Sequence, residues 1–377
     1  MILPKLFMLF YILVYVFFLF LLIFVAVSKK EYPKTIILFF VLSISLVCGL
    51  RAPIVGTDTF SFYQLTKEMV EQNSFLWSKD YFYYGITRFF YTDFGYIGTV
   101  FPPTLITSLM LTLSYNEITK YDFNYGVDNY VTKGLNRTFY LTLSYFILIS
   151  SSDFLFQIIN QTRQLMSMSF ALFGGLCLFK KDIFKAIIFF ILATFSHHSA
   201  PLVIACFIGV YFLRSTKLWL ILLALAIIFS LMGFSKYILA IAGLTIDRDS
   251  IYYSAINSSF VLYLKTMTTC FLGALCLFIA RRRIKENGVF HYFINFYFAV
   301  CSLAVLLVVY GEASNRIQRY AGVTFPILFT MALSKVKIKE GIIVLIIFIS
   351  MLYMMFFMTY DSTLSTIGVY RESGFSR

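Results

Sequence analysis

The sequence predicts an all-α, polytopic integral membrane protein, with about 12 transmembrane helices (range 10 to 13) around an outward-facing polar cavity. Three observations predict this class. Of the 377 residues, 60% are hydrophobic and only 13% are charged. The mean hydropathy is +0.84. Apolar runs alternate with short segments rich in lysine and arginine along residues 1–377, so we expect a single transmembrane domain.

The net charge of +13 is better explained by orientation in the membrane than by nucleic-acid binding. The lysines and arginines stand between apolar runs and form no basic arm or stripe. Short loops rich in these residues stay on the cytoplasmic side of a membrane. More than half of the 31 lysines and arginines fall in segments that we assign to the inner face on this ground. We therefore expect no nucleic-acid partner.

The first apolar run, Leu6 to Val27, is too long for a signal peptide and is expected to remain as the first transmembrane helix. The lysines that follow it place the next loop inside, and residues 51–94 then form the first large outer loop. Residues 115–137 are polar and are expected to form an inner loop. Further spans are expected, in order, at residues 35–50, 95–113, 139–149 and 165–179.

The apolar run from Ala186 to Leu213 carries two of the chain's three histidines, His197 and His198, in its middle. As one helix it would be about 42 Å long, which exceeds the roughly 30 Å hydrocarbon core. Both of its ends are basic, which favours the inner face for each end. We therefore expect two short crossings or a re-entrant pair, with the histidines at the outer turn. A single crossing is the alternative.

The remaining chain repeats the same alternation. Arg281, Arg282, Arg283 and Lys285 are the strongest inner-face signal. Residues 234–259 are expected to form a second outer loop, and residues 312–320 a short outer loop. All six cysteines fall within apolar runs without metal-ligand spacing, so they are expected to be small buried residues, and we expect neither a metal nor a cofactor. Further spans are expected at residues 219–233, 260–280, 289–310, 321–333 and 342–360.

The expected outer ends of the helices hold isolated arginines beside polar side chains. The planar guanidinium fork of arginine suits bidentate contact with phosphate, so several of them around an outward-facing cavity suit a lipid-linked diphosphate. One outer arginine alone is as well explained by a lipid head group or an ion pair. The outer arginines are Arg51, Arg163, Arg316 and Arg319, and the polar residues that accompany them are Asp58, Gln164, His197 and His198.

At several of these positions the chain resembles the EpsG-type, Wzy-like polysaccharide polymerases of bacterial envelopes. The resemblance rests on Val55-Gly56-Thr57-Asp58 with Tyr63 after an early helix, and on Thr162-Arg163-Gln164 opening a middle helix. It rests further on His197-His198-Ser199-Ala200, which fits a His-x-Ser-Ala pattern, and more loosely on Arg319-Tyr320. These short motifs occur in the expected order over most of the chain.

The resemblance implies a glycosyltransferase on the outer face of the bacterial inner membrane. It would transfer a growing glycan from undecaprenyl diphosphate onto an incoming lipid-linked oligosaccharide repeat, without a metal. A chain-length-regulating membrane protein is a candidate partner. His197 is the first choice for the general base, with His198 as its competitor and Asp58 as the alternative. The candidate substrate-binding residues are Arg51, Arg163, Gln164, Arg316, Arg319, Tyr63, Tyr320 and His198.

Three other functions are compatible with the same pattern. An O-antigen ligase-like enzyme uses the same donor with a different acceptor, but usually has a larger late outer loop. A polyprenyl-phosphate-sugar-dependent glycosyltransferase would use an acidic residue of the first outer loop, for which Asp58 is suitably placed. A flippase or transporter of lipid-linked oligosaccharides would bind diphosphate through arginines and would need no base. Activity after replacement of the histidines would separate these functions.

Overall fold

The computed structural model describes residues 2–28, 31–56, 58–73, 80–125, 136–234, 237, 259–281, 288–335, 346 and 349. All regular secondary structure in these residues is helical, apart from one isolated β-bridge between Ile2 and Arg51. The predicted all-α class is therefore confirmed. The chain folds into two compact units. The expected single transmembrane domain stays a prediction.

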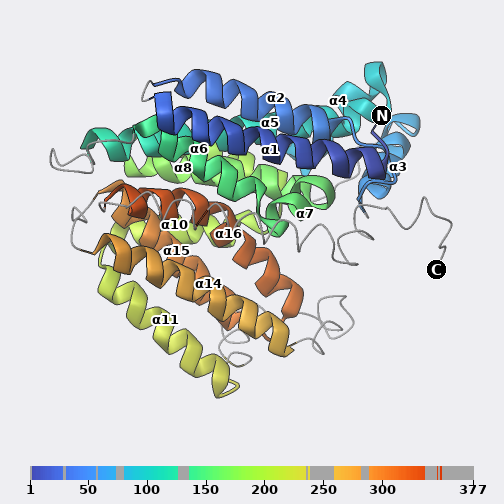
Figure 1. Ribbon diagram of the computed structural model, residues 1–377. Helices are drawn as coiled ribbons and strands as arrows, with labels where there is room; N and C mark the ends of the chain where they lie inside the picture. The colour runs from blue at the N-terminus through green and yellow to red at the C-terminus, as the bar shows by residue number, and fades with distance from the viewer. Residues whose placement is uncertain are drawn as a thin grey trace. The chain divides into compact units, whose positions relative to one another are not determined.

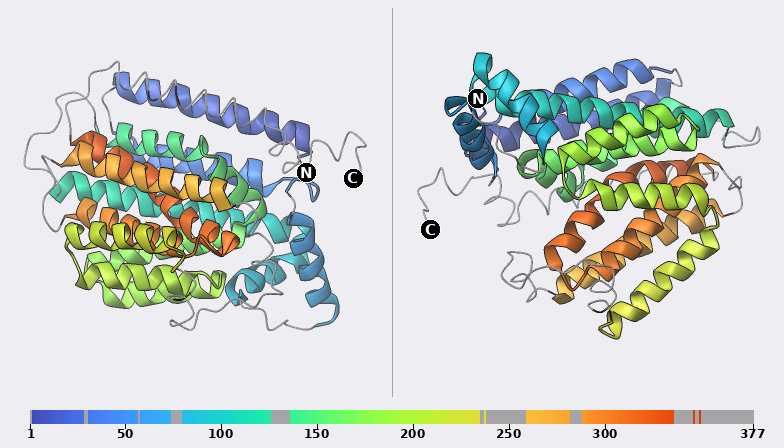
Figure 2. Two further views of the ribbon diagram at one scale, coloured as in Figure 1. Left: turned by 90° about the horizontal axis from the view of Figure 1, so that it is seen from below. Right: turned by 180° about the vertical axis from the view of Figure 1, so that it is seen from behind.

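Unit 1 contains the helices of the N-terminal half (Figure 1). Helices α1, α2 and α6 pack side by side, and α8 packs against α9. The two shorter helices α3 and α4 lie at the end of the unit where the chain begins, as Figure 2 also shows. The helices are α1 (Pro4–Ser28), α2 (Pro33–Gly49), α3 (Thr59–Glu71), α4 (Tyr81–Phe94), α5 (Tyr96–Tyr125), α6 (Arg137–Ile149), α7 (Ser152–Asn160), α8 (Thr162–Phe179) and α9 (Ile183–Ser196).

Unit 2 contains the helices that follow Ala200, together with the end of α5 from Tyr121. Helix α15 packs against α11, α14 and α16, and α14 also packs against α16. Lys335, which the sequence places at the inner face, is buried and pairs with Asp122 at 2.9 Å. The helices are α10 (Ala200–Phe212), α11 (Thr216–Leu231), α14 (Ser259–Ala280), α15 (Val289–Leu306) and α16 (Gly311–Ser334).

Four helical segments of the described chain are long and apolar enough to cross a membrane, and a fifth qualifies if the bent pair α6 and α7 counts as one span. Helix α1 shows why such helices suit lipid, because both of its faces are apolar. Phe7, Phe18 and Leu22 are buried against the protein, whereas Phe20 and Phe24 are exposed. The four segments are Pro4–Ser28, Tyr96–Phe123, Leu262–Ala280 and Val289–Leu306.

The chain breaks between α6 and α7, whose axes differ by 71°. Backbone groups at such a break need partners, because lipid offers none. The hydroxyl of Tyr11 on α1 donates to the carbonyl of Ile149 at 2.8 Å. The side chain of Ser151 accepts the backbone N–H of Phe154 and caps α7. The broken pair is thus fixed by side chains at its bend.

Three predicted loops contain helices. Residues 115–125 continue α5, residues 312–320 form the first turns of α16, and the first outer loop contains α3 and α4. Hydropathy predicts that polar runs lie in water as loops. Polar side chains can also lie on helices inside a protein, where other protein groups supply their hydrogen bonds. The predicted span at residues 342–360 and the second outer loop, apart from residues 234, 237 and 259, lie outside the described residues.

The break predicted at the two histidines is confirmed. Helix α9 ends at Ser196 and α10 begins at Ala200, with Pro201 near its start, where a missing N–H costs nothing. His197 has extended backbone angles, φ −161° and ψ 134°, which end α9. Helices of 14 and 13 residues are about 20 Å long, too short to cross the core separately without tilt or thinning.

Candidate functional site

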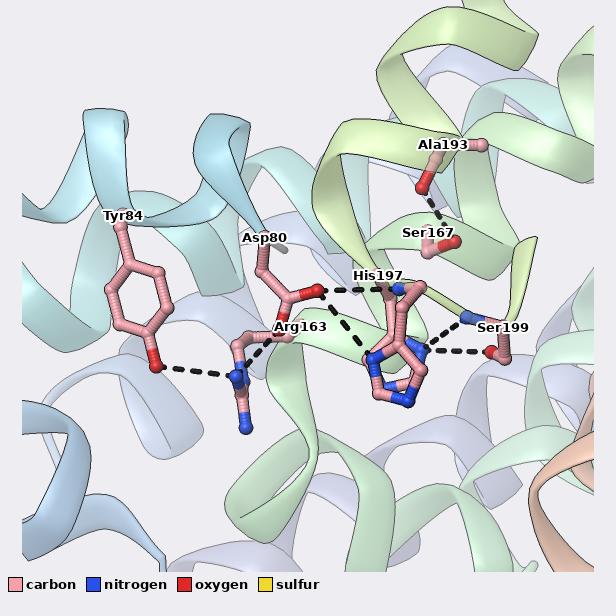
Figure 3. A network of polar contacts seen from close by, with 8 residues as sticks. Asp80, Tyr84, Arg163, Ser167, Ala193, His197 and Ser199 are labelled. Carbon is pink, nitrogen blue, oxygen red and sulfur yellow. Dashed lines mark hydrogen bonds and ion pairs between the residues drawn. The ribbon is translucent and has the colours of Figure 1, made fainter. Parts of the chain in front are cut away.

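Polar side chains from separate parts of unit 1 meet at the N-terminal ends of α4 and α8 and at the link between α9 and α10. We call Asp80, Tyr84, Arg163, His197 and His198 the Asp80 cluster. Figure 3 shows the carboxylate of Asp80 between Arg163 on one side and the His197–Ser199 segment on the other. Two of the predicted motifs are therefore brought together by a residue that belongs to neither.

Arg163, the second residue of α8, is held by three neighbours. Its Nη1 lies 2.6 Å from Oδ2 of Asp80 and donates to the hydroxyl of Tyr84 at 3.2 Å. The guanidinium also stacks on the ring of Phe62 from α3, 4.4 Å from the ring centroid. The side chain remains 27% exposed. An arginine that is oriented in this way and still accessible can receive an anionic group.

Asp80 connects the two halves of the cluster. One of its oxygens binds Arg163, and the other accepts the backbone N–H of His198 at 3.2 Å and lies 3.8 Å from Nδ1 of that ring. Burial raises the pKa of Asp80, but the neighbouring side chain of His198 and the charge of Arg163 outweigh burial, so the pKa lies below its usual value. Asp80 is therefore a carboxylate at neutral pH.

Asp80 was missed in the sequence because it adjoins the aromatic residues 81–84, which are typical of a membrane interface. The available signal was an acidic residue directly before an aromatic, amphipathic segment, which is a common way to begin a helix.

The two histidines have different surroundings, although they are adjacent and their rings stack with centroids 4.3 Å apart. His197 is buried, and its Nδ1 lies 2.8 Å from Oγ of Ser199 and accepts the backbone N–H of Ser199 at 3.2 Å. The side chain of His198 is 40% exposed beside Asp80. Ser167 of α8 donates to the carbonyl of Ala193 at 2.9 Å. This hydrogen bond holds the last turn of α9, next to the histidines, against α8.

Arg51 is 2% exposed and its guanidinium is occupied by the fold. It donates to the carbonyl of Cys48 at the end of α2 and to the carbonyl of Ile159 at the end of α7, the latter at 3.0 Å. Its Nε donates to Oγ1 of Thr59 at 3.3 Å. A cation at two helix C-terminal ends satisfies orphan carbonyls and favours both helix dipoles. These contacts favour a structural role over the predicted contact with substrate.

Arg51→Lys is expected to destabilise the protein by roughly 3 kcal/mol, because one ammonium cannot reproduce the fork that binds two helix ends. The thermal unfolding midpoint of the detergent-solubilised protein measures this change. Activity per folded molecule is expected to remain near that of the wild type. A variant that is as stable as the wild type but inactive would instead assign Arg51 to substrate binding.

The other predicted residues of unit 1 lie on the elements around the cluster. Asp58 is half-buried at the start of α3, and Gln164 is buried one residue beyond Arg163. Tyr63 belongs to an aromatic group, with its ring 5.4 Å from that of Tyr96 and 6.0 Å from that of Tyr91. Tyr63 therefore has a packing role that needs no sugar.

The late predicted residues lie on α16 in unit 2. Arg316 pairs with Glu312 at 2.9 Å, while Arg319 and Tyr320 are buried. On α14, a predicted span, Lys265 donates to Asn315 of α16 at 3.2 Å, a contact that hydropathy alone could not reveal. A charged residue within a span faces polar protein groups rather than lipid, and α16 supplies them here.

Among the described residues, no group of three or more His, Cys, Asp or Glu side chains could hold a metal ion. The cysteines at all six positions are free thiols in helices, and five of them are buried.

Several apolar helices and a partly buried cluster of ionisable groups define a helical membrane protein with a polar site. The chain belongs to the EpsG family, because the model of that family matches residues 34–371. This confirms the resemblance that the short motifs indicated. Membership suggests a polysaccharide-polymerase type of function. No curated protein and no solved structure matches the chain.

Proposed function

We propose that the protein is a polysaccharide polymerase of the bacterial inner membrane. It transfers a growing glycan from undecaprenyl diphosphate onto an incoming lipid-linked oligosaccharide repeat at the outer face. The observation that carries this proposal is the guanidinium of Arg163, which Asp80 holds beside two histidines in a chain of the EpsG family. That arrangement combines a cation for a diphosphate with a group that can accept a proton.

The reaction needs both parts. The anomeric carbon of the growing glycan loses its bond to the diphosphate oxygen, which leaves with the electron pair, and gains a bond to a hydroxyl oxygen of the acceptor. A preoriented guanidinium in a water-poor site stabilises the charge that develops on the diphosphate. A base removes the hydroxyl proton. The proposed chemistry uses no metal, and Arg316 and Arg319 are proposed to contact a lipid-linked diphosphate.

The proposed topology places the Asp80 cluster at the outer face. It has about 12 crossings with the lysine-rich segments inside and an outward-facing polar cavity. The break between α9 and α10 falls at the histidines, where the proposed hairpin requires its turn.

The gel pattern of polymer from cells deleted for this gene and complemented with variants tests the function. We expect the deletion to accumulate single lipid-linked repeats on the outer face, and wild-type protein to restore a ladder. Repeats that remain on the inner face of the deletion strain would support a flippase. A ladder of normal length on the lipid carrier, with loss only of its attachment to a final acceptor, would support a ligase.

A further inference from the structure

The neighbouring histidines cannot be separated by the motif in which they occur, but their hydrogen bonds distinguish them. Neutral imidazole carries one proton, so one ring nitrogen donates and the other accepts. The nitrogen that faces a hydrogen-bond donor must be the acceptor, and the other nitrogen then carries the proton. The contacts of each Nδ1 therefore determine what each Nε2 can do.

In His197, Nδ1 accepts the backbone N–H of Ser199 at 3.2 Å, and a backbone N–H can only donate. The hydroxyl of Ser199, 2.8 Å from the same nitrogen, can donate to it as well. This Nδ1 is therefore unprotonated, and in the neutral ring the proton is on Nε2. The Nε2 of His197 can donate a hydrogen bond, but it has no lone pair with which to take a proton.

In His198, Nδ1 lies 3.8 Å from a carboxylate oxygen of Asp80, which can only accept. The negative charge of this oxygen favours the tautomer that carries its proton on Nδ1 and its lone pair on Nε2. The distance is longer than a hydrogen bond, and such contacts in ligand-free sites often shorten when substrate binds. Asp80 also accepts the backbone N–H of His198 at 3.2 Å, which fixes the chain beside the carboxylate.

We propose that His198 is the general base of the transfer, that Asp80 is its positioning residue, and that His197 donates a hydrogen bond from Nε2. The inference rests on the proposed function and assigns the roles within it. The proton of the acceptor hydroxyl passes to Nε2 of His198 as the new glycosidic bond forms. Asp80 stabilises the resulting imidazolium.

In the described part of the chain, the two histidines are faced by one fixed positive charge and one carboxylate. The two rings stack at 4.3 Å, and Arg163 adds a fixed positive charge. Asp80 is the carboxylate that faces these groups, and Tyr84 contributes a neutral hydroxyl to Arg163. His198 lies beside the carboxylate and is partly open to solvent, whereas His197 is buried.

Glutamine replacements separate a donor from a base, because an amide donates hydrogen bonds but takes no proton near neutral pH. The assay measures polymer formation against pH by purified protein in lipid vesicles, with lipid-linked repeats extracted from cells deleted for this gene. We expect His198→Gln to lose about 100-fold or more and to lack the acid limb of the wild-type profile. We expect His197→Gln to lose less than about tenfold and to keep that limb. Imidazole added to His198→Ala is expected to restore part of the rate.

Asp80→Asn tests the positioning role of Asp80 through the dependence of the rate of polymer formation on pH, and not through the rate alone. Without the carboxylate the imidazolium is less stable, so the acid limb is expected to move to lower pH, and Asp80→Glu is expected to return it toward the wild-type position. A His197→Gln protein without the acid limb, or a His198→Gln protein that retains it, would overturn the assignment. Wild-type protein that forms no polymer in these vesicles would refute the proposed function itself.

Discussion

Arg163→Lys is expected to lower the rate of polymer formation about 100-fold or more, with the protein still present in the membrane. The guanidinium binds Asp80, donates to Tyr84 and stacks on Phe62, and it still presents part of its surface. Lysine keeps the charge but offers no planar fork and no flat face for stacking, so it would place that charge poorly against a diphosphate. The rate in lipid vesicles, normalised to the amount of folded protein, measures the effect.

Arg88→Lys is the matched control, because Arg88 lies on α4, as Tyr84 does, and donates to Asn73 at the exposed surface. We expect this variant to keep the wild-type rate. Equal activity of Arg163→Lys and Arg88→Lys would show that a precise guanidinium is not needed, and the proposed contact with diphosphate would have to be abandoned.

Gly56→Ala is expected to destabilise the protein by at least about 3 kcal/mol and to remove most of it from the membrane. Gly56 has φ +93°, which side chains rarely adopt, and an added Cβ would lie 2.9 Å from the carbonyl oxygen of Ile159. That oxygen also accepts from Arg51 and Thr59. The methyl group would therefore displace the contacts that join α2, α3 and α7. Thermal unfolding in detergent and the amount of protein in membranes both measure the loss.

Gly85→Ala is the control for a glycine within residues 51–94. An added Cβ at Gly85 meets nothing within 4 Å, and alanine favours a helix over glycine by up to about 1 kcal/mol. We expect the control to be neutral or slightly stabilising. If Gly56→Ala unfolds at the same temperature as the wild type, the close approach of Gly56 to the end of α7 is not required for stability.

The sequence predicted most of the helices, because lipid imposes long apolar segments that hydropathy detects. The predicted spans coincide with the helices α1, α2, α11, α14 and α15, of which α1, α14 and α15 are also long and apolar enough to cross a membrane. The break at His197 was predicted from the length of the run and its basic ends. The errors fall where the protein itself solvates polar groups. Asp122 lies in the extension of α5 that the sequence assigned to a loop, yet it is buried against Lys335.

By itself the sequence determined the membrane class, the family motifs and most of the residue types of the site. Arginine and histidine are costly in an apolar setting, so their positions marked the site before the fold was known. Only the tertiary structure decided which of these residues meet. Asp80 and Arg163 are 83 positions apart, and Asp80 and His198 are 118 apart. No local pattern encodes such pairings, because they follow from how helices pack across the chain, and the same packing turned Arg51 inward to helix ends and left Arg163 partly exposed.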